Sequence, residues 1–383
     1  MSYVVRRWIR PRNLWIVVLL VVSGCMASGR QLYNESEAER ARIVGFENIR
    51  IQADAPRPPR AVYDPWRPVT KKAEPAMLAI SGGGAGGAFS VGILSAWSDL
   101  GTRPTFDVVT GVSTGALIAP FAFLGPEYDQ RLRRLYLSDQ SRNLVDIDWR
   151  GFGIFSPSFL KGEGLRRMVE ANITDDILRR IAHEHRSGRR LLVMTTNLDT
   201  QHAVVWNVGA IADSGSAGAL ELVRQVLIAS ASVPGVLPPI VIKAVVDGKQ
   251  IEEMHSDGGS SAQFFTLPEQ LILDPNSRKE NLHIYVIINN ALIPEFAMPA
   301  ERALPIMGRA YSILLKTHTK QGLMALYNFA QRSGVGLDIA SIDVQVPYSM
   351  KDPLDHQYMK IVFDRGYERT MNKLIWRKRP VFK

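Results

Sequence analysis

Ile80-Ser81-Gly82-Gly83-Gly84-Ala85-Gly86-Gly87 joins an apolar run to a helical pattern. A second turn of the same kind follows at Thr110-Gly111-Val112-Ser113-Thr114-Gly115-Ala116. A repeated order of apolar run, tight glycine turn and helix is typical of parallel strands connected by helices. We therefore expect an α/β fold in three layers, with a mainly parallel sheet and helices on both faces.

The alternation continues outward from these two turns. Strands are expected at 77–81, 107–110, 191–196, 203–206, 283–289 and 342–346. Helices are expected at 88–98, 114–123, 164–171, 175–185, 219–230, 302–331 and 355–373. With 46% apolar and 22% charged residues, the chain can bury a large core, which excludes a disordered, collagen-like or polytopic membrane protein.

The two turns also predict chemistry. The glycines of the first turn leave backbone N–H groups uncovered, which suits an anion. They also fit Gly-X-Gly-X-X-Gly of a dinucleotide site, but that site requires an acidic residue about 20 positions later at the end of the next strand. Asp107 instead opens that strand, and Gly-X-Ser-X-Gly follows, which is the pattern of a nucleophile elbow around Ser113. An oxyanion loop beside a nucleophile favours acyl transfer.

A serine nucleophile needs a base, and Asp257 stands before Gly258 and Gly259. Taken alone, this Asp-Gly-Gly is equally consistent with a tight turn. The glycine loop, Gly-X-Ser-X-Gly and Asp-Gly-Gly, in this order, resemble the patatin-like phospholipase family. Residues 229–239 also resemble the Ala-Ser-X-X-X-Pro loop of that family. The resemblance extends from about residue 76 to the C-terminus.

The resemblance implies a role for each matching residue. Ser113 would be the nucleophile and Asp257 its base, without a histidine, and Gly82, Gly83 and Gly84 would supply the oxyanion hole. The substrate would be acyl esters of membrane lipids, and neither a metal nor an organic cofactor is implied. Because a carboxylate in water is a weak base, this dyad requires a partly dry pocket that raises the aspartate pKa.

Two positions depart from the family pattern. Gly86 stands where the family carries Arg or Lys, and Gln263 stands where it commonly has Asn. We expect Gly86→Arg to raise turnover if the backbone φ at this position is negative. A catalytically silent scaffold of the cell envelope with the same fold is the alternative function.

Histidines offer a different catalytic arrangement. A triad hydrolase with the chain order Ser, Asp, His would take its catalytic histidine from the residues after Asp257. The candidates are His283, His318 and His356. His255 would lie on the same side of an extended segment as Asp257 and could tune the site. Structural roles are the commoner outcome for such histidines, so the dyad is favoured.

The N-terminus predicts a lipoprotein signal. Four arginines without an acid precede the apolar run 14–22, which is too short to cross about 30 Å of hydrocarbon as a helix. Val22-Ser23-Gly24-Cys25 resembles a bacterial lipobox, in which Cys25 is acylated and becomes the new terminus. Met26 resembles the pattern of lipoproteins sent to the outer membrane. The alternatives are an ordinary signal peptide and an uncleaved anchor.

We therefore expect a signal peptide at 1–24, a lipidated tether at 25–75 and the hydrolase domain at 76–383. Asn34 and Glu37 predict the start of a short helix extending to Val44, and six prolines within 55–75 predict an extended stretch. The alternative is that this stretch wraps the domain as an ordered arm.

Charge and cysteine content limit the partners. Cys25 is the only cysteine, so an intrachain disulfide or a cysteine-based metal site is excluded. The net charge of +9 is partly due to the signal arginines, so nucleic-acid binding is not expected. Basic and aromatic residues after Arg369 suit either a lipid headgroup layer or a tail that docks on the domain. The sequence leaves the oligomeric state open.

Overall fold

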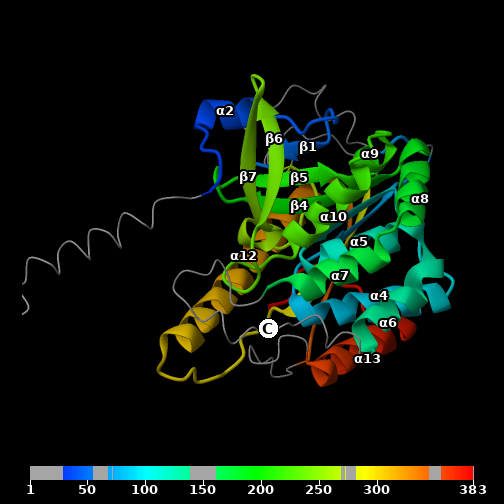
Figure 1. The fold of residues 1–383 in the computed structure, drawn as a ribbon. Coiled ribbons are helices and arrows are strands. Elements are labelled where there is room, and N and C mark those ends of the chain that lie inside the picture. Colours follow the sequence, from blue (N-terminus) through cyan, green and yellow to red (C-terminus); the bar gives the residue numbers. More distant parts are fainter. Residues whose placement is uncertain are drawn as a thin grey trace, which may run out of the picture. The chain divides into compact units, whose positions relative to one another are not determined.

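A computed structural model describes residues 29–54, 68–70, 72–138, 161–268, 272, 282–344 and 355–382 (Figure 1). Cys25 and the signal sequence lie outside the described residues, as does most of the proline-rich stretch. The chain divides into two compact units. The smaller is Met1–Val44 with Lys243–Glu252, and the larger is Gly45–Ile242 with Glu253–Lys383.

The larger unit is built on a mainly parallel sheet, which confirms the expected fold class. The strand order is β1-β5-β4-β3-β2-β8-β9, with β7 also paired to β4, and β6 paired to β7. The five neighbouring strands β4-β3-β2-β8-β9 are parallel to one another. In contrast, β1 pairs antiparallel with β5, and β5 and β7 both pair antiparallel with β4. Their bounds are β1 Arg50–Gln52, β2 Ala76–Ile80, β3 Val108–Val112, β4 Arg190–Asn197, β5 Ala203–Asn207, β6 Ile240–Val246, β7 Lys249–Asp257, β8 His283–Ala291 and β9 Gly336–Ile342.

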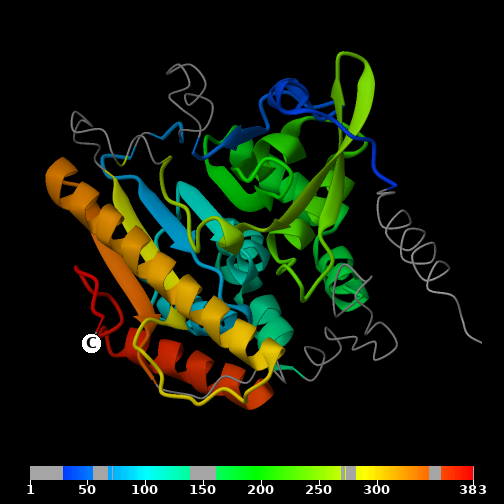
Figure 2. The same ribbon diagram turned by 90° about the vertical axis from the view of Figure 1, so that its left-hand side faces the viewer.

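Helices connect and cover these strands. The helices of the larger unit are α4 Gly87–Asp99, α5 Thr114–Leu124, α6 Asp129–Leu137, α7 Glu163–Asn172, α8 Asp175–Arg186, α9 Val208–Asp213, α10 Ala219–Ser230, α12 Ala303–Ser333 and α13 His356–Met371. Short 3-10 turns are η2 Gly84–Gly86, η3 Pro126–Tyr128 and η6 Gly258–Ser260. Figure 2 shows α12 as the long yellow-to-orange helix.

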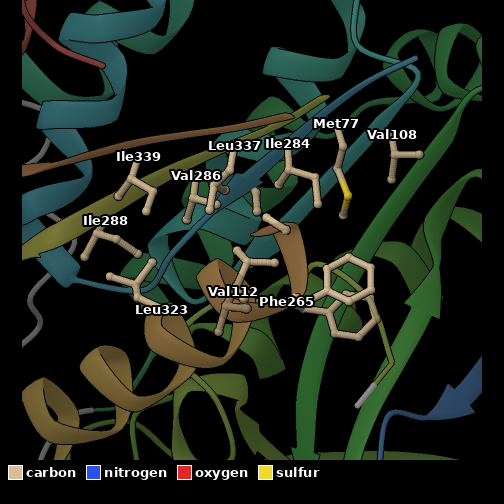
Figure 3. Packing of buried hydrophobic residues seen from close by; sticks show 14 of the residues in the cluster. Met77, Val108, Val112, Phe265, Ile284, Val286, Ile288, Leu323, Leu337 and Ile339 are labelled. Carbon is tan, nitrogen blue, oxygen red and sulfur yellow. The ribbon is translucent and has the colours of Figure 1, made fainter. Parts of the chain in front are cut away.

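Both faces of the central strands are buried. One face packs against α12, where Leu323, Leu326 and Phe329 join a cluster with residues of the sheet (Figure 3). On β2, Met77 belongs to this cluster, whereas the neighbouring Leu78 is also fully buried and points to the other face. A strand that is apolar on both sides is expected for a parallel sheet between helix layers.

The structure adds strands that the sequence did not predict and moves one that it did. The strand expected at 342–346 is wrong, because β9 ends at Ile342 and pairs with β8 from Gly336 onward. Gly334, in the left-handed region at φ 67°, ends α12 early enough for β9 to follow. The strand β1 lies before residue 76, where we expect the hydrolase domain to begin, and it pairs with β5 of the same sheet.

The smaller unit contains α2 (Glu35–Arg40) and the outer part of the β6–β7 hairpin. The Asn34 side chain accepts a hydrogen bond from the Glu37 N–H, and Glu37 accepts one from the Asn34 N–H. This capping box confirms the expected helix start, although the helix ends at Arg40 instead of Val44. Asp247 and Gly248, both at positive φ, close the hairpin.

Candidate active site

Ser113 occupies a strained turn between β3 and α5. Its φ of 56° and ψ of −126° lie outside the usual regions for a residue with a side chain. A Cβ on Gly111 would lie 2.4 Å from the Gly115 carbonyl oxygen, and one on Gly115 would lie 2.3 Å from the Ile80 carbonyl oxygen. Both glycines of Gly-X-Ser-X-Gly are therefore required by backbone packing, as the geometry of a nucleophile elbow demands.

Ser113 and Asp257 are brought together by two separate elements. The Ser113 Oγ donates a hydrogen bond of 2.5 Å to Asp257 Oδ2. Asp257 is the last residue of β7, and in the sheet it lies opposite Thr195 of β4. The Gly259 N–H donates to Asp257 Oδ1 at 2.6 Å and so fixes the carboxylate. The predicted nucleophile and base are direct partners in the structure.

Burial changes the protonation behaviour of this pair. Ser113 is 7% exposed and Asp257 is 3% exposed. Burial raises the pKa of Asp257 to about 7, although the hydrogen bonds from Ser113 and Gly259 act in the opposite direction. A carboxylate with this pKa can accept a proton near neutral pH, which an ordinary aspartate with a pKa of 3.8 does poorly.

The Ala-Ser block at 229–239 supports the elbow directly. The Ser113 N–H donates to Ser230 Oγ at 3.0 Å, and the Ser230 hydroxyl donates to the Met194 carbonyl at 2.7 Å. The Asp257 N–H donates to the Ser232 carbonyl at 2.9 Å. The sequence identified this block, but its contacts with both members of the dyad become visible only in the structure.

The glycine loop lies beside Ser113, but its three predicted donors differ. A Cβ built on Gly82 would lie 3.2 Å from the Ser113 Cβ. The Gly82 N–H already donates to the Gln263 carbonyl at 2.9 Å, which commits that amide and differs from the expected role. For the N–H groups of Gly83 and Gly84, the structure shows no acceptor among the residues that it describes. The geometry therefore favours Gly83 and Gly84 as oxyanion donors.

Asn289, at the carboxyl end of β8, anchors this loop and was missed from the sequence. Its side chain accepts from the Ser90 hydroxyl at 2.7 Å and donates to the Ser81 carbonyl at 2.8 Å. Its carbonyl oxygen would lie 2.4 Å from a Cβ on Gly83, whose φ is 150°. The only available signal was its place at the end of a predicted parallel strand, where functional side chains gather.

Gly86 cannot take the residue that the family carries. Its φ of −59° would suit any residue, but a Cβ would lie 2.0 Å from the Asn289 carbonyl oxygen. The φ condition for Gly86→Arg is therefore met, but β8 fills the space that the side chain needs, so we now expect this substitution to give no gain in turnover. Gln263, the second departure, donates from its side chain to the Gly259 carbonyl at 3.0 Å and thus supports the loop that carries Asp257.

Within the described residues, no histidine contacts Ser113 or Asp257. The His283 Nε2 lies 2.7 Å from Asp338 Oδ2, and this bond raises the pKa of His283. His318 is exposed on α12, and His356 begins α13. The described geometry therefore brings together the dyad and not the triad.

His255 lies under the site in a separate polar cluster. Its imidazole is fully buried between Thr195 Oγ1, at 3.0 Å, and Glu253 Oε2, at 3.2 Å. Burial lowers the pKa of His255 even though Glu253 acts to raise it. Glu253 also forms an ion pair with Arg50 of β1. His255 thus contributes to the sheet beneath Asp257 without reaching Ser113.

Tyr311 is a second residue near the dyad that the sequence did not reveal. Burial raises its pKa to about 12, the negative charge of Asp257 adds to this rise, and a hydrogen bond with Ser260 opposes it. Tyr311 lies on α12, and nothing in a long helical pattern distinguishes one tyrosine as facing a catalytic loop.

The aromatic and basic tail packs on the larger unit. The Trp376 ring lies 4.8 Å from Trp97 and 5.2 Å from Tyr285. Arg369 bonds to Asp343 at 2.5 Å, and Lys378 bonds to Asp338 at 2.9 Å. These contacts match the alternative in which the tail docks on the domain, and the side chains of Lys373, Arg377 and Arg379 are exposed.

Within the described residues, no group of three or more His, Cys, Asp or Glu side chains is arranged to hold a metal ion. Among the helices described, none combines the length and apolar character needed to cross a membrane.

Fold and site define the class of protein: an α/β protein with a serine–aspartate pair at a nucleophile elbow. Residues 78–268 match the family model "Patatin-like phospholipase". The chain therefore contains a patatin-like phospholipase domain, which confirms the resemblance seen in its motifs. No curated protein matches the sequence at a significant level.

Two solved structures of bacterial proteins are similar. VipD from Legionella pneumophila is 13% identical with a TM-score of 0.42, over 79% of this chain and 67% of that one. ExoU from Pseudomonas aeruginosa, solved with SpcU, is 14% identical with a TM-score of 0.32, over 80% of this chain. The match spans about half of the ExoU chain, 52%.

Proposed function

We propose that this protein hydrolyses acyl esters of membrane lipids, with Ser113 as nucleophile and Asp257 as base. The family match supports lipid acyl hydrolase activity in general. The observation that carries the specific assignment is the 2.5 Å hydrogen bond from Ser113 Oγ to a buried carboxylate whose pKa is raised to about 7. This is the arrangement that an activated serine requires.

The reaction has two halves. Ser113 Oγ attacks the ester carbonyl carbon while its proton passes to Asp257, and the carbonyl oxygen becomes an oxyanion held by the amides of Gly83 and Gly84. The carbon–alkoxide bond then breaks, and Asp257 returns the proton to the leaving alcohol. In the second half, Asp257 takes a proton from water, which attacks the acyl-enzyme and releases the fatty acid. Since the base must be ionised, turnover rises with pH through about 7.

We further propose that Cys25 carries the lipid anchor, in the cell envelope and at the outer membrane. The lipobox-like 22–25 and Met26 support this proposal. Two or three acyl chains hold a protein stably on a bilayer where one does not. Cys25→Ser should abolish labelling with radioactive fatty acid and leave the precursor uncleaved. If Cys25→Ser has the same mass and membrane retention as the wild type, the proposed lipid anchor is overturned, whereas the proposed hydrolytic function is not affected.

The test of the hydrolytic function compares Ser113→Ala with the wild type. Hydrolysis of a short-chain nitrophenyl ester and of a phospholipid should be lost, while the circular dichroism spectrum stays the same. Ser187→Ala is the matched control, because Ser187 is exposed at the end of α8 and bonds only locally. A wild type without activity on either substrate would favour the silent scaffold instead.

A further inference from the structure

The first half of α12 exposes apolar side chains next to the active site. Phe296 and Met298, in the segment before the helix, are 94% and 85% exposed. Four more large apolar side chains that are at least half exposed follow on the helix. They are Ile306, Met307, Ile313 and Leu314. These six residues are called the apolar tip below.

The second half of α12 shows that this exposure is not a general property of the helix. There Leu323, Leu326 and Phe329 are buried in the core against the sheet, and Leu323 appears in Figure 3. The exposed positions of that half are mostly polar, such as Gln321 and Asn328. The helix thus has an ordinary amphipathic half and a half whose outer face is apolar. A contiguous apolar surface of this kind marks an interaction site.

Contacts at the carboxyl end of β8 relate the apolar tip to the site. Asn289, near this end of the strand, holds the glycine loop through the Ser81 carbonyl. The segment before α12 leaves β8 at the same end, and Lys316 of α12 donates to the Ile293 carbonyl in that segment at 3.3 Å. Met307 and Leu314 are seven positions apart, so they share one side of the helix. The exposed apolar surface therefore lies on the part of α12 that is held at the edge of the sheet where the glycine loop lies.

The charges of this region favour an anionic surface. From Ala303 to Ser333, α12 has four arginines and lysines and no aspartate or glutamate, and with Glu295, Glu301 and Arg302 of the preceding segment the net charge of residues 292–333 is 5 − 2 = +3. Arg302 is exposed at the start of the helix. Glu295, in the preceding segment, is paired with Lys316 at 3.1 Å. Basic side chains close to an anionic membrane surface are attracted to it.

We propose that the apolar tip inserts into the surface of a bilayer containing anionic lipids and presents acyl esters to Ser113. Apolar side chains beside basic ones match the acyl and headgroup layers of such a surface. The delivery of substrate rests on the proposed hydrolase function, whereas insertion of the tip does not. A protein partner or a second copy of the chain would need neither lipid nor anionic charge, so the experiment separates these occupants.

Insertion is measured with a fluorescent label that senses its environment. Cys25 is the only cysteine, so a Cys25→Ser, Ser113→Ala background accepts one reporter cysteine and cannot hydrolyse the lipid. Met298→Cys and Leu314→Cys report on the tip, and Asn328→Cys, exposed in the second half of α12, is the control. The full chain is mixed with vesicles of phosphatidylcholine and phosphatidylglycerol that carry a quencher in the acyl region.

The tip labels should shift to the blue and be quenched, whereas the Asn328→Cys label should change little. The variants differ only in the position of the label. Any attachment of the chain to the vesicle through its N-terminal segment is therefore the same in all of them and does not affect the comparison. Equal behaviour of all three labels would overturn the proposal. A blue shift of the tip labels that depends on protein concentration and not on vesicles would overturn it in favour of self-association.

A second experiment tests substrate delivery. Met307→Asp or Leu314→Asp in the otherwise wild-type chain should lower the ratio of vesicle to soluble-ester hydrolysis by about tenfold or more. Met324→Asp is the matched control, because Met324 is similarly exposed but lies in the second half of α12, and it should leave the ratio unchanged. An equal ratio in all variants would overturn delivery by the tip. Absence of hydrolysis in every chain would instead count against the proposed function, and the label result would stand.

Discussion

Two glycine turns at the ends of neighbouring parallel strands perform opposite tasks. The turn after β3 places a side chain, Ser113, at the site and commits its own N–H to Ser230. The turn after β2 presents no side chain, and the structure shows no acceptor for the N–H groups of Gly83 and Gly84 in the described ranges. One turn offers a nucleophile, and the other offers hydrogen-bond donors.

The glycines serve different purposes in the two turns. In the elbow, Gly111 and Gly115 let α5 approach β2 and β3, and only Ser113 has a positive φ. In the loop, Gly83 and Gly84 themselves have positive φ, and Gly83 also faces the Asn289 carbonyl. The elbow therefore stores its strain at the reactive residue, whereas the loop avoids strain by having no side chains.

The largest effect should come from the base that completes the elbow. Asp257→Asn keeps the shape of the side chain but removes the proton acceptor, so turnover on a soluble ester should fall by about 10² to 10⁴. Steady-state kinetics near neutral pH measures this loss. The controls are His283→Ala, His318→Ala and His356→Ala, which should each retain most activity. Near-total loss in one of these, with little loss in Asp257→Asn, would replace the dyad by a triad.

A smaller effect should follow in the loop. Gly83→Ala meets both an unfavourable φ and the Asn289 carbonyl, so the amide should move and turnover should fall by roughly 10² to 10³, as when an oxyanion donor is lost. Gly101→Ala is the matched control, because its φ of 66° is also positive but no atom lies near the added methyl group. If the two variants lose equal activity, the loop has no special part in catalysis.

Gly86→Ala should affect stability more than chemistry. The methyl group would collide with the Asn289 carbonyl, so the free energy of unfolding should fall by about 1 to 3 kcal/mol, and Gly86→Arg should lose at least as much. Urea denaturation of both variants measures this change. Full stability together with faster turnover in Gly86→Arg would show that the missing cation, and not the packing of β8, limits the loop.

The two turns also show what the sequence could reveal. The motifs identified Ser113, Asp257 and the parallel strands, because glycine spacing and apolar runs are local signals. The commitment of the Gly82 amide and the lack of room at Gly86 depend on the carbonyls of Gln263 and Asn289, which come from distant segments. The short strand β1 and the long hairpin were missed because only their partners in the sheet define them.

The pH dependence of stability gives the most specific prediction. The pKa of Asp257 is raised from 3.8 to about 7 in the folded protein, so between these values the unfolded chain releases a proton that the folded chain retains. The free energy of unfolding contributed by Asp257 therefore decreases as pH rises through this window and is constant above it. Relative to the wild type, Asp257→Asn should gain stability from about pH 4 to 7. Urea midpoints that differ by the same amount at every pH would contradict the raised pKa.

The most direct test of the Ser113–Asp257 pair is covalent labelling with a fluorophosphonate, followed by intact mass and peptide mapping. The wild type should gain one probe at Ser113, Ser113→Ala should gain none, and Asp257→Asn should react slower by about 10² or more. Labelling of Asp257→Asn as fast as the wild type, or labelling of Ser113→Ala at another serine, would contradict the account.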